Sequence, residues 1–395
     1  MSDLYFNLTL PFYVGSKAGS NATYNLSQNN QDVALRKLPF SLYVDKHYLF
    51  PRLYLTSEIE ASISEAYENS SMISSPLGTS SLANIRMTEI ADALKNAANN
   101  DFINKTFVEI GSGTGHLLSR VRDLGANVIG FEIGPQGVES QKEFDLQIIN
   151  DYFDTKYLIE KVDCIFSSGC LEHIIDLDHF VKNAIEALNP NGLFFHSVPN
   201  SLIHFEKGKV EGLTHEHINY FTPENAVRFL NKIGLMNCEA TLSAAGNELF
   251  LWGYKSENHI EDLSREMHDD EFLEEKNNLI GYERLLKKNL SKRISKLQNI
   301  VNSRQRTIGF YGGGAEICFL AKLEKNARFF DGDESKWGQK WFPGLSDIEN
   351  PERLANDSVD DLVICVEHYA DAILKTLVNK KLLNKNVKVH LLSEL

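Results

Sequence analysis

Two short motifs hold the residues whose types and spacing can do chemistry. The first is Phe107–His116, read as FVEIGSGTGH, in which Glu109 precedes glycines at every second position, namely Gly111, Gly113 and Gly115. Such glycines let a chain turn tightly and bring its backbone against a ligand at the start of a helix. The dinucleotide fingerprint G-x-G-x-x-G needs a small residue where His116 stands. The motif therefore predicts a cofactor-binding loop and argues against a loop that binds the pyrophosphate of a dinucleotide.

The second motif is Thr214–Phe221, read as THEHINYF, in which His215 and His217 flank Glu216. Two imidazoles beside a carboxylate can supply a general base near neutral pH. The zinc-protease pattern H-E-x-x-H is absent, so the motif predicts no metal ion. A polar turn between a strand and a helix, with no chemical role, is the alternative that these residues leave open.

An alternation of strand-like and helix-like segments must position both motifs. Within residues 106–254 the candidate strands are Thr106–Ile110, Val128–Glu132, Leu146–Ile149, Val162–Ser167 and Gly192–Val198. Such alternation predicts an α/β fold, a parallel sheet with helices on both faces. Two further apolar runs, Leu235–Leu242 and Glu248–Tyr254, predict antiparallel edge strands.

The flanking segments predict further elements. Short β-like runs at 39–44 and 48–55 precede a helical pattern over Ser57–Glu68, and another helix is expected over 85–98. Residues 258–305 predict one long amphipathic helix, with acidic residues towards its start and basic residues towards its end. Beyond it, a second and smaller α/β domain is predicted by four candidate strands, Thr307–Tyr311, Ala327–Asp331, Asp361–Val366 and Val387–Leu392.

The glycine motif resembles motif I of the class I S-adenosylmethionine (SAM) dependent methyltransferases. Later segments agree with that superfamily: Asp163–His173 looks like its fourth strand, and Ala187–Leu193 like the turn into its fifth. The resemblance implies a Rossmann-like domain with seven strands and SAM as cofactor. Glu132 would bind the ribose hydroxyls, and Asp151 and Phe153 the adenine. The cofactor-binding residues that it implies are Glu109, Gly111, Gly113, Gly115, Glu132, Asp151, Phe153 and Ser168.

Together with its flanking sections, the chain resembles the sugar C-methyltransferases that act on nucleotide-linked 4-keto-deoxysugars. The sections are an N-terminal substrate section, a SAM domain, a linking helix and a C-terminal Rossmann-like domain, at 1–84, 85–256, 257–305 and 306–395. The resemblance implies a sugar acceptor, with His217 as the general base, Glu216 assisting it and His215 beside them. Thr214 stands where that family has a tyrosine, so O-methylation and C-methylation both stay open.

The N-terminal section departs from that family, which carries four zinc-binding cysteines there. No cysteine precedes Cys164, and Asp45 stands in one cysteine position, so a degenerate module without zinc is expected. In the C-terminal domain, the glycines after the first strand either contact a phosphate or form a plain tight turn. The candidate substrate residues are Tyr67, Thr214, Tyr220, Gly313 and Gly314.

Composition narrows the classes of protein and partner. The net charge is −14, from 40 Lys plus Arg and 54 Asp plus Glu, which argues against a nucleic-acid binder. Five cysteines without a CxxC pair favour free thiols in a reducing compartment. Neither an export signal nor a membrane span is indicated, so a cytoplasmic monomer or homodimer is expected. An NAD-dependent sugar oxidoreductase and a non-catalytic scaffold subunit are the alternative functions.

Overall fold

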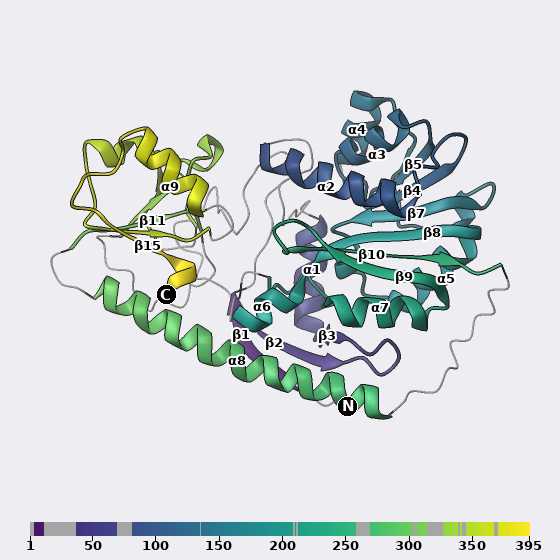
Figure 1. The fold of residues 1–395 in the computed structure, drawn as a ribbon, viewed down its shortest axis with the longest axis horizontal. Helices are drawn as coiled ribbons and strands as arrows, with labels where there is room; N and C mark the ends of the chain where they lie inside the picture. The colour runs from purple at the N-terminus through teal and green to yellow at the C-terminus, as the bar shows by residue number, and fades with distance from the viewer. Residues whose placement is uncertain are drawn as a thin grey trace.

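A computed structural model defines the fold. It describes residues 4–11, 37–68, 81–134, 136–207, 210, 212–257, 269–302, 306–313, 327–338, 340–341, 345–366 and 370–395. Figure 1 shows three sheets with one long helix running beneath them. None of the helices in these ranges combines the length and the apolar character that crossing a membrane requires.

The central sheet has seven strands in the order β6-β5-β4-β7-β8-β10-β9. Their bounds are β4 Thr106–Ile110, β5 Asn127–Phe131, β6 Ile148–Ile149, β7 Val162–Ser168, β8 Leu188–Pro199, β9 Leu235–Leu242 and β10 Glu248–Lys255. Strands β4 to β8 pair in parallel, whereas β10 runs antiparallel to β8 and β9. The strand order reverses between β4 and β7, and the carboxyl ends of strands at such a reversal are where open α/β sheets bind ligands.

Helices cover both faces of this sheet. They are α2 Ser81–Ala97, α3 His116–Asp123, α4 Gln136–Phe144, α5 Leu177–Ala187 and α7 Pro223–Lys232. Neighbouring residues of β8 show why the strands are apolar throughout: Phe195 packs in the core with α2 and α3, and Phe194 packs in the core with α5 and α7. Successive strand residues point to opposite faces, so a sheet buried on both sides needs apolar residues at both.

The predicted strands are confirmed, with small shifts at their ends. The second one ends at Phe131, so Glu132 lies just beyond it at the sheet edge. The third is only Ile148–Ile149, because Asp145 turns the chain with a positive φ of 52° shortly before it.

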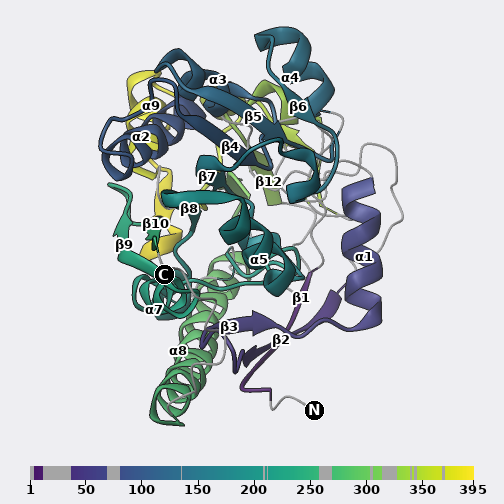
Figure 2. The same cartoon turned by 90° about the vertical axis from the view of Figure 1, so that its right-hand side faces the viewer.

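The N-terminal section folds as a small antiparallel sheet of β1 Phe6–Pro11, β2 Lys37–Val44 and β3 Pro51–Leu53, followed by α1 Ser57–Glu68. The helix and the later two strands agree with the sequence prediction, whereas β1 was not predicted. Figure 2 shows this sheet beside α8, away from the central sheet. Phe6, Phe40 and Phe205 share one apolar cluster, the last of them on α6 Ser201–Lys207.

Asp45 closes the turn between β2 and β3 with its own side chain. Its Oδ1 accepts hydrogen bonds from the backbone N–H groups of His47 (2.8 Å) and Tyr48 (2.9 Å). Its Oδ2 pairs with Arg52 Nη1 at 3.2 Å. Hydrogen bonds and one ion pair thus hold the turn that the resemblance relates to a zinc-binding knuckle.

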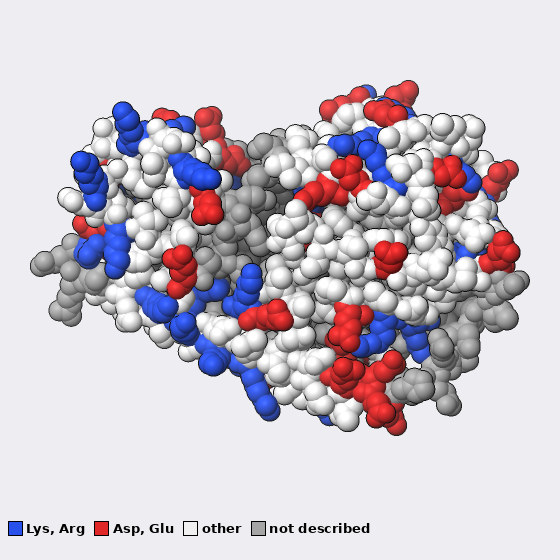
Figure 3. All heavy atoms as spheres, in the orientation of Figure 1, with Lys and Arg blue, Asp and Glu red and all other residues white. Residues whose placement is uncertain are grey.

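The long helix α8 spans Asp269–Val301 and joins the N-terminal and C-terminal sheets. Leu279 and Leu286 pack with the N-terminal strands, and the same cluster includes Leu297 with residues of the C-terminal sheet. In Figure 3 the acidic residues gather at the N-terminal end of α8 and the basic residues along its C-terminal half. The predicted residues 258–268 and 303–305 lie outside the described ranges.

The C-terminal sheet is fully parallel, in the order β13-β12-β11-β14-β15. Its strands are β11 Ile308–Tyr311, β12 Ala327–Phe330, β13 Ile348–Glu349, β14 Asp361–Ile364 and β15 Lys388–Leu391, with α9 Ala370–Asn379 preceding the last. Four of these strands were predicted; β13, with two residues, is too short to leave a pattern in the sequence.

Candidate functional site

The glycine loop leaves the end of β4 at the reversal of strand order. Gly111, Gly113 and Gly115 have φ values of 69°, 53° and 75°, a backbone region that side chains strongly disfavour. A Cβ on Gly115 would lie 2.8 Å from Ser140 Cβ, so this glycine allows close packing of the loop. A Cβ on Gly113 would meet no described atom within 4 Å. Gly113 is therefore the position at which a ligand can approach the backbone.

Glu132 fixes this loop from the next strand. Its Oε2 accepts a hydrogen bond from Gly113 N at 2.8 Å, and its Oε1 accepts one from Gly134 N at 2.7 Å. Burial raises the pKa of Glu132, while these backbone donors lower it. Oε1 also accepts a hydrogen bond from Gln136 Nε2 at 2.9 Å. Since Oε2 can accept a second hydrogen bond, Glu132 can hold the loop and also bind a ligand hydroxyl.

Glu109 lies buried on β4 close to Glu132. Its Oε2 has no hydrogen-bond partner among the described residues. Burial, together with the neighbouring Glu132, raises the pKa of Glu109 well above its usual value. Ser168 Oγ, at the end of β7, is also buried without a partner among the described residues. Unsatisfied polar atoms at both strand ends are consistent with a ligand that supplies hydrogen bonds.

The two residues predicted to contact adenine, Asp151 and Phe153, differ in their exposure to solvent. Asp151 is partly exposed and accepts hydrogen bonds from Tyr152 N and from the Tyr157 hydroxyl, which together hold its pKa below the usual value. Phe153 is only 8% exposed and packs edge-on against Phe131, with ring centroids 5.2 Å apart. The ring of Phe153 thus packs in the core, and its contact with adenine stays a prediction. Tyr152, 72% exposed, is the accessible aromatic residue beside Asp151.

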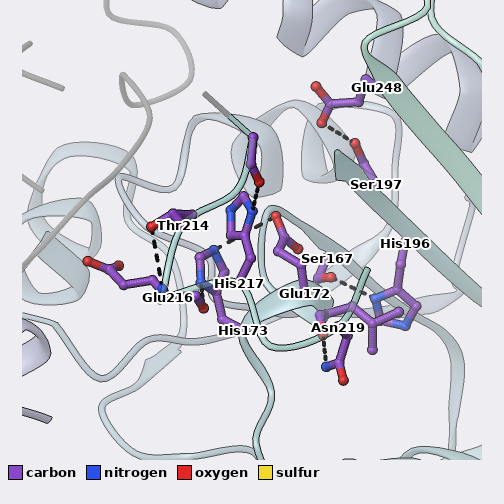
Figure 4. A network of polar contacts seen from close by, with 12 residues as sticks. Ser167, Glu172, His173, His196, Ser197, Thr214, Glu216, His217, Asn219 and Glu248 are labelled. Carbon is purple, nitrogen blue, oxygen red and sulfur yellow. Dashed lines mark hydrogen bonds and ion pairs between the residues drawn. The ribbon is translucent and has the colours of Figure 1, made fainter. Parts of the chain in front are cut away.

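The His-Glu-His segment meets the turn that follows β7. Figure 4 shows His217 and His173 facing one another, with Glu172 beside them. Their ring centroids are 4.9 Å apart, and His173 Nε2 lies 3.8 Å from Glu172 Oε1. Glu172 and His173 belong to the 3₁₀ turn Leu171–His173 (η2). We call these three residues the Glu172 cluster.

Both imidazoles of the cluster are oriented by backbone carbonyls. His173 Nδ1 lies 2.8 Å from Glu216 O, and His217 Nδ1 lies 3.3 Å from Gly212 O. A carbonyl oxygen only accepts hydrogen bonds, so each Nδ1 carries the proton. In the neutral ring, the lone pair is then on Nε2.

Hydrogen bonds join the two segments that form the cluster. Ile218 N and Asn219 N donate to Glu172 O at 2.7 and 3.0 Å, and Asn219 Nδ2 donates to Leu171 O at 2.9 Å. Thr222 and Asn225 then form a reciprocal capping box that starts α7. Backbone and side-chain hydrogen bonds thus fix the segment at both ends.

Burial changes the ionisation of the cluster. It lowers the pKa of His173 to about 4 and that of His217 well below its usual value, the latter also through repulsion from His173. It raises the pKa of Glu172 to about 8. Around pH 7 the three side chains are therefore neutral in the absence of a charged ligand.

The other residues predicted in this segment turn elsewhere. His215 Nε2 lies 3.1 Å from Pro39 O, and its ring packs against Phe40, so it serves the contact with β2. The Glu216 carboxylate points away from both imidazole rings in Figure 4. The Tyr220 hydroxyl is buried and donates a hydrogen bond to Thr214 O at 2.9 Å, so it stabilises the conformation of the segment. Of the three predicted catalytic residues, the structure brings His217 alone into the cluster.

Of the remaining predicted substrate residues, the structure describes the surroundings of Gly313 and Thr214. A Cβ on Gly313 would lie 2.5 Å from the Trp341 ring, so this glycine packs in the C-terminal sheet rather than opening towards a phosphate. Thr214 Oγ1 accepts a hydrogen bond from Glu216 N at 3.4 Å. Gly314 and the side chain of Tyr67, on α1, lie outside what the structure describes.

Glu172 and His173 were given no individual role in the sequence analysis. The signal that identifies both is their position directly after β7, at the carboxyl edge beside the strand reversal. This turn lies close to the glycine loop, because a Cβ on Gly111 would be 3.3 Å from Cys170 Sγ. The glycine loop and the Glu172 cluster therefore adjoin.

A family model described as "Methyltransferase domain" matches residues 82–240. One curated relative is a ubiquinone biosynthesis O-methyltransferase of Methylobacterium sp. (strain 4-46), 26% identical over 156 residues, which are 34% of this chain and 61% of the relative. Another is C-methyltransferase NovU of Streptomyces niveus, 29% identical over 124 residues, 29% of each chain. The chain thus spans about three fifths of the length of the first relative.

Among solved structures, magnesium protoporphyrin IX methyltransferase of Synechocystis PCC 6803 with bound SAM aligns with a TM-score of 0.34 and 13% identity, over 44% of this chain and 82% of its own. The class of the central part rests on the family match and on the strand order: residues 82–240 contain a methyltransferase domain. The match to the family model supports SAM as the cofactor of the domain.

Proposed function

We propose that this protein transfers a methyl group from SAM to a sugar, most simply one linked to a nucleotide. The observation that carries the proposal is the space beside the backbone of Gly113. Glu132 holds this glycine at the strand reversal, and the glycine loop adjoins the Glu172 cluster. A donor site and a polar acceptor site then lie side by side, as methyl transfer between two bound molecules requires.

The residues present fit SAM. Gly113 admits a ligand against the backbone, Glu132 has acceptor capacity for ribose hydroxyls, and the buried oxygens of Glu109 and Ser168 lack partners among the described residues. The chemistry that bound SAM supplies is a methyl group on a sulfonium: the acceptor bonds to its carbon, and sulfur keeps the electron pair of the broken bond. The protein binds both molecules, aligns them and excludes water.

His217 is the base that we propose for the acceptor. Its Nδ1 donates to Gly212 O, which leaves the lone pair of Nε2 to take a proton from a hydroxyl or from an acidic carbon. The sugar acceptor is supported by the resemblance of the whole chain to sugar C-methyltransferases, and the similarity to C-methyltransferase NovU supports methyl transfer. Thr214 in place of a tyrosine favours oxygen over carbon as the methylated atom.

A hydroxylated aromatic ring is the second candidate acceptor. Four of the curated relatives are named ubiquinone biosynthesis O-methyltransferases. O-methylation of a phenol needs the same donor site and one base, so the geometry around His217 serves it equally well.

Mass spectrometry after incubation with SAM distinguishes these acceptors. The full chain is offered a panel of nucleotide sugars and, separately, a panel of polyhydroxylated aromatic compounds. We expect one added methyl group on a nucleotide sugar, and less of that product with Glu132→Gln when SAM is below saturation. Methylation of aromatic compounds alone would reject the sugar acceptor and keep the methyltransferase. Purification with a bound nicotinamide and no SAM binding would instead favour an oxidoreductase.

A further inference from the structure

The Glu172 cluster has the composition of a metal site that the sequence did not predict. One oxygen of Glu172 and one ring nitrogen each of His173 and His217 lie within 4.8 Å of one another. We propose that these three residues bind a divalent transition-metal cation. The proposal rests on the geometry of the cluster and goes beyond methyl transfer.

The orientation of the rings is the first support. Histidines that bind metal ions almost always donate their other N–H to a carbonyl or carboxylate, which fixes the ring and its tautomer. Here His173 Nδ1 donates to Glu216 O and His217 Nδ1 to Gly212 O, at 2.8 and 3.3 Å. Both rings therefore present Nε2 from an orientation that the backbone already sets.

The carboxyl group of Glu172 is the second support. The residue is 3% exposed, and its Oε2 has no hydrogen-bond partner among the described residues. A buried carboxyl oxygen without a partner is costly to a fold, and a bound cation would satisfy it. Glu172 O meanwhile accepts hydrogen bonds from Ile218 N and Asn219 N, so the backbone that carries the carboxyl group is anchored.

The distances require only a small contraction. Ligand atoms at the usual 2.0–2.2 Å from one tetrahedral zinc ion are about 3.3–3.6 Å apart. His173 Nε2 and Glu172 Oε1 are 3.8 Å apart. All three ligand atoms lie within 4.8 Å of one another, so side-chain rotations that shorten these distances by about 1 Å would complete the site.

The donor set selects the class of cation. Two imidazoles and one carboxylate suit zinc, iron or cobalt, whereas magnesium and calcium prefer oxygen ligands alone. Three protein ligands also leave a coordination position for an oxygen of the acceptor. A cation there would make that oxygen more acidic, so a bound hydroxyl would lose its proton more readily. Because the lone pair of His217 would bind the cation, the role of general base proposed above belongs to the protein without a bound cation.

The test is metal binding by the full chain, without SAM and without acceptor. Protein carrying no polyhistidine tag is treated with a chelator and titrated with Co²⁺. We expect one Co²⁺ per chain with visible d–d absorption bands, displaced by Zn²⁺ and not by an equal concentration of Mg²⁺. Because neither methyl donor nor acceptor is present, the result is independent of whether the proposed function holds.

Variants locate the ion. Glu172→Gln, which preserves the shape of the side chain, and His217→Ala should each weaken Co²⁺ binding at least about 100-fold, beyond the effect of losing an outer partner. His179→Ala, an exposed histidine on α5, is the matched control and should bind as the unmodified protein does. Circular dichroism checks that each variant is folded.

A measurement on the unmodified protein covers the case in which a variant does not fold. Pulsed electron paramagnetic resonance with Cu²⁺ as the probe counts coordinated imidazoles, and we expect two. Fewer than two imidazoles, an absence of Co²⁺ bands, or binding that survives both Glu172→Gln and His217→Ala would overturn the proposal.

Discussion

The backbone N–H of Gly113 donates a hydrogen bond to Glu132 Oε2 at 2.8 Å. This bond ties the glycine loop after β4 to the carboxylate after β5, so the two features expected to bind SAM form one unit. A change in either residue should therefore weaken SAM binding more than it lowers the stability of the fold.

Glu132→Gln should weaken SAM binding by about 10-fold to 100-fold, the equivalent of losing a hydrogen bond to a charged group. An amide retains the shape, but its NH₂ group would face the N–H of Gly113 or Gly134, which cannot accept a hydrogen bond. Isothermal titration with SAM measures the change. Glu143→Gln, at an exposed carboxyl on α4, should leave the affinity as it is; equal affinities of the two variants would contradict the assignment.

Gly113→Ala and Gly115→Ala should separate binding from stability. Both glycines have positive φ, so each substitution carries a backbone cost of about 1–2 kcal/mol. At Gly115 the new methyl group would also overlap Ser140 and Leu146, at 2.8 Å from each, whereas at Gly113 it enters open space. Urea denaturation should show a larger loss of unfolding free energy for Gly115→Ala than for Gly113→Ala. The loss of SAM affinity should be larger for Gly113→Ala. Equal losses of stability would show that Gly113 is also packed.

Arg86→Ala should lower the unfolding free energy by about 2 kcal/mol, less than for a fully buried pair because Arg86 is partly exposed. Arg86, on α2, binds both oxygens of the buried Glu248 on β10, at 2.7 and 2.6 Å. Without the guanidinium, Glu248 keeps only neutral partners such as Ser197. Urea denaturation gives the value. Lys95→Ala, which breaks an ion pair with the exposed Asp92, should change stability by less than about 0.5 kcal/mol. A similar loss in both variants would refute the prediction.

Glu349→Gln should destabilise the protein near pH 7 and progressively less at acidic pH. Two hydrogen bonds from Arg328, each 2.7 Å, hold the pKa of Glu349 below its usual value. A carboxyl whose pKa is lower in the folded than in the unfolded protein stabilises the fold above its unfolded pKa, and this contribution is lost as the pH falls through the folded pKa.

Urea denaturation of the unmodified protein and of Glu349→Gln at pH 7 and at steps below pH 5 measures this dependence. Glu352→Gln, at a carboxyl that is 64% exposed, serves as the control. A difference between Glu349→Gln and the unmodified protein that stays constant with pH would rule out a contribution from this ion pair.

Most of the central sheet could be predicted because parallel strands buried on both faces are continuous apolar runs, such as Val162–Ser168. Strands without that signal were missed. The strand β1 is not a continuous apolar run, since FNLTLP alternates apolar and polar residues as a half-buried strand does. The strand β13 has two residues, which are too few for a pattern.

The sequence by itself determined the glycine loop and the place of Glu132, because a strand, a glycine turn and a helix follow one another within a few residues and the acid comes directly after the next strand. Only the tertiary structure decided the neighbourhood of His217. Its partners Glu172 and His173 come from a distant turn, and packing of the segment between β2 and η2 turns His217 towards them and His215 away. Side-chain direction in an irregular segment depends on what packs on each side of it, and sequence spacing does not contain that information.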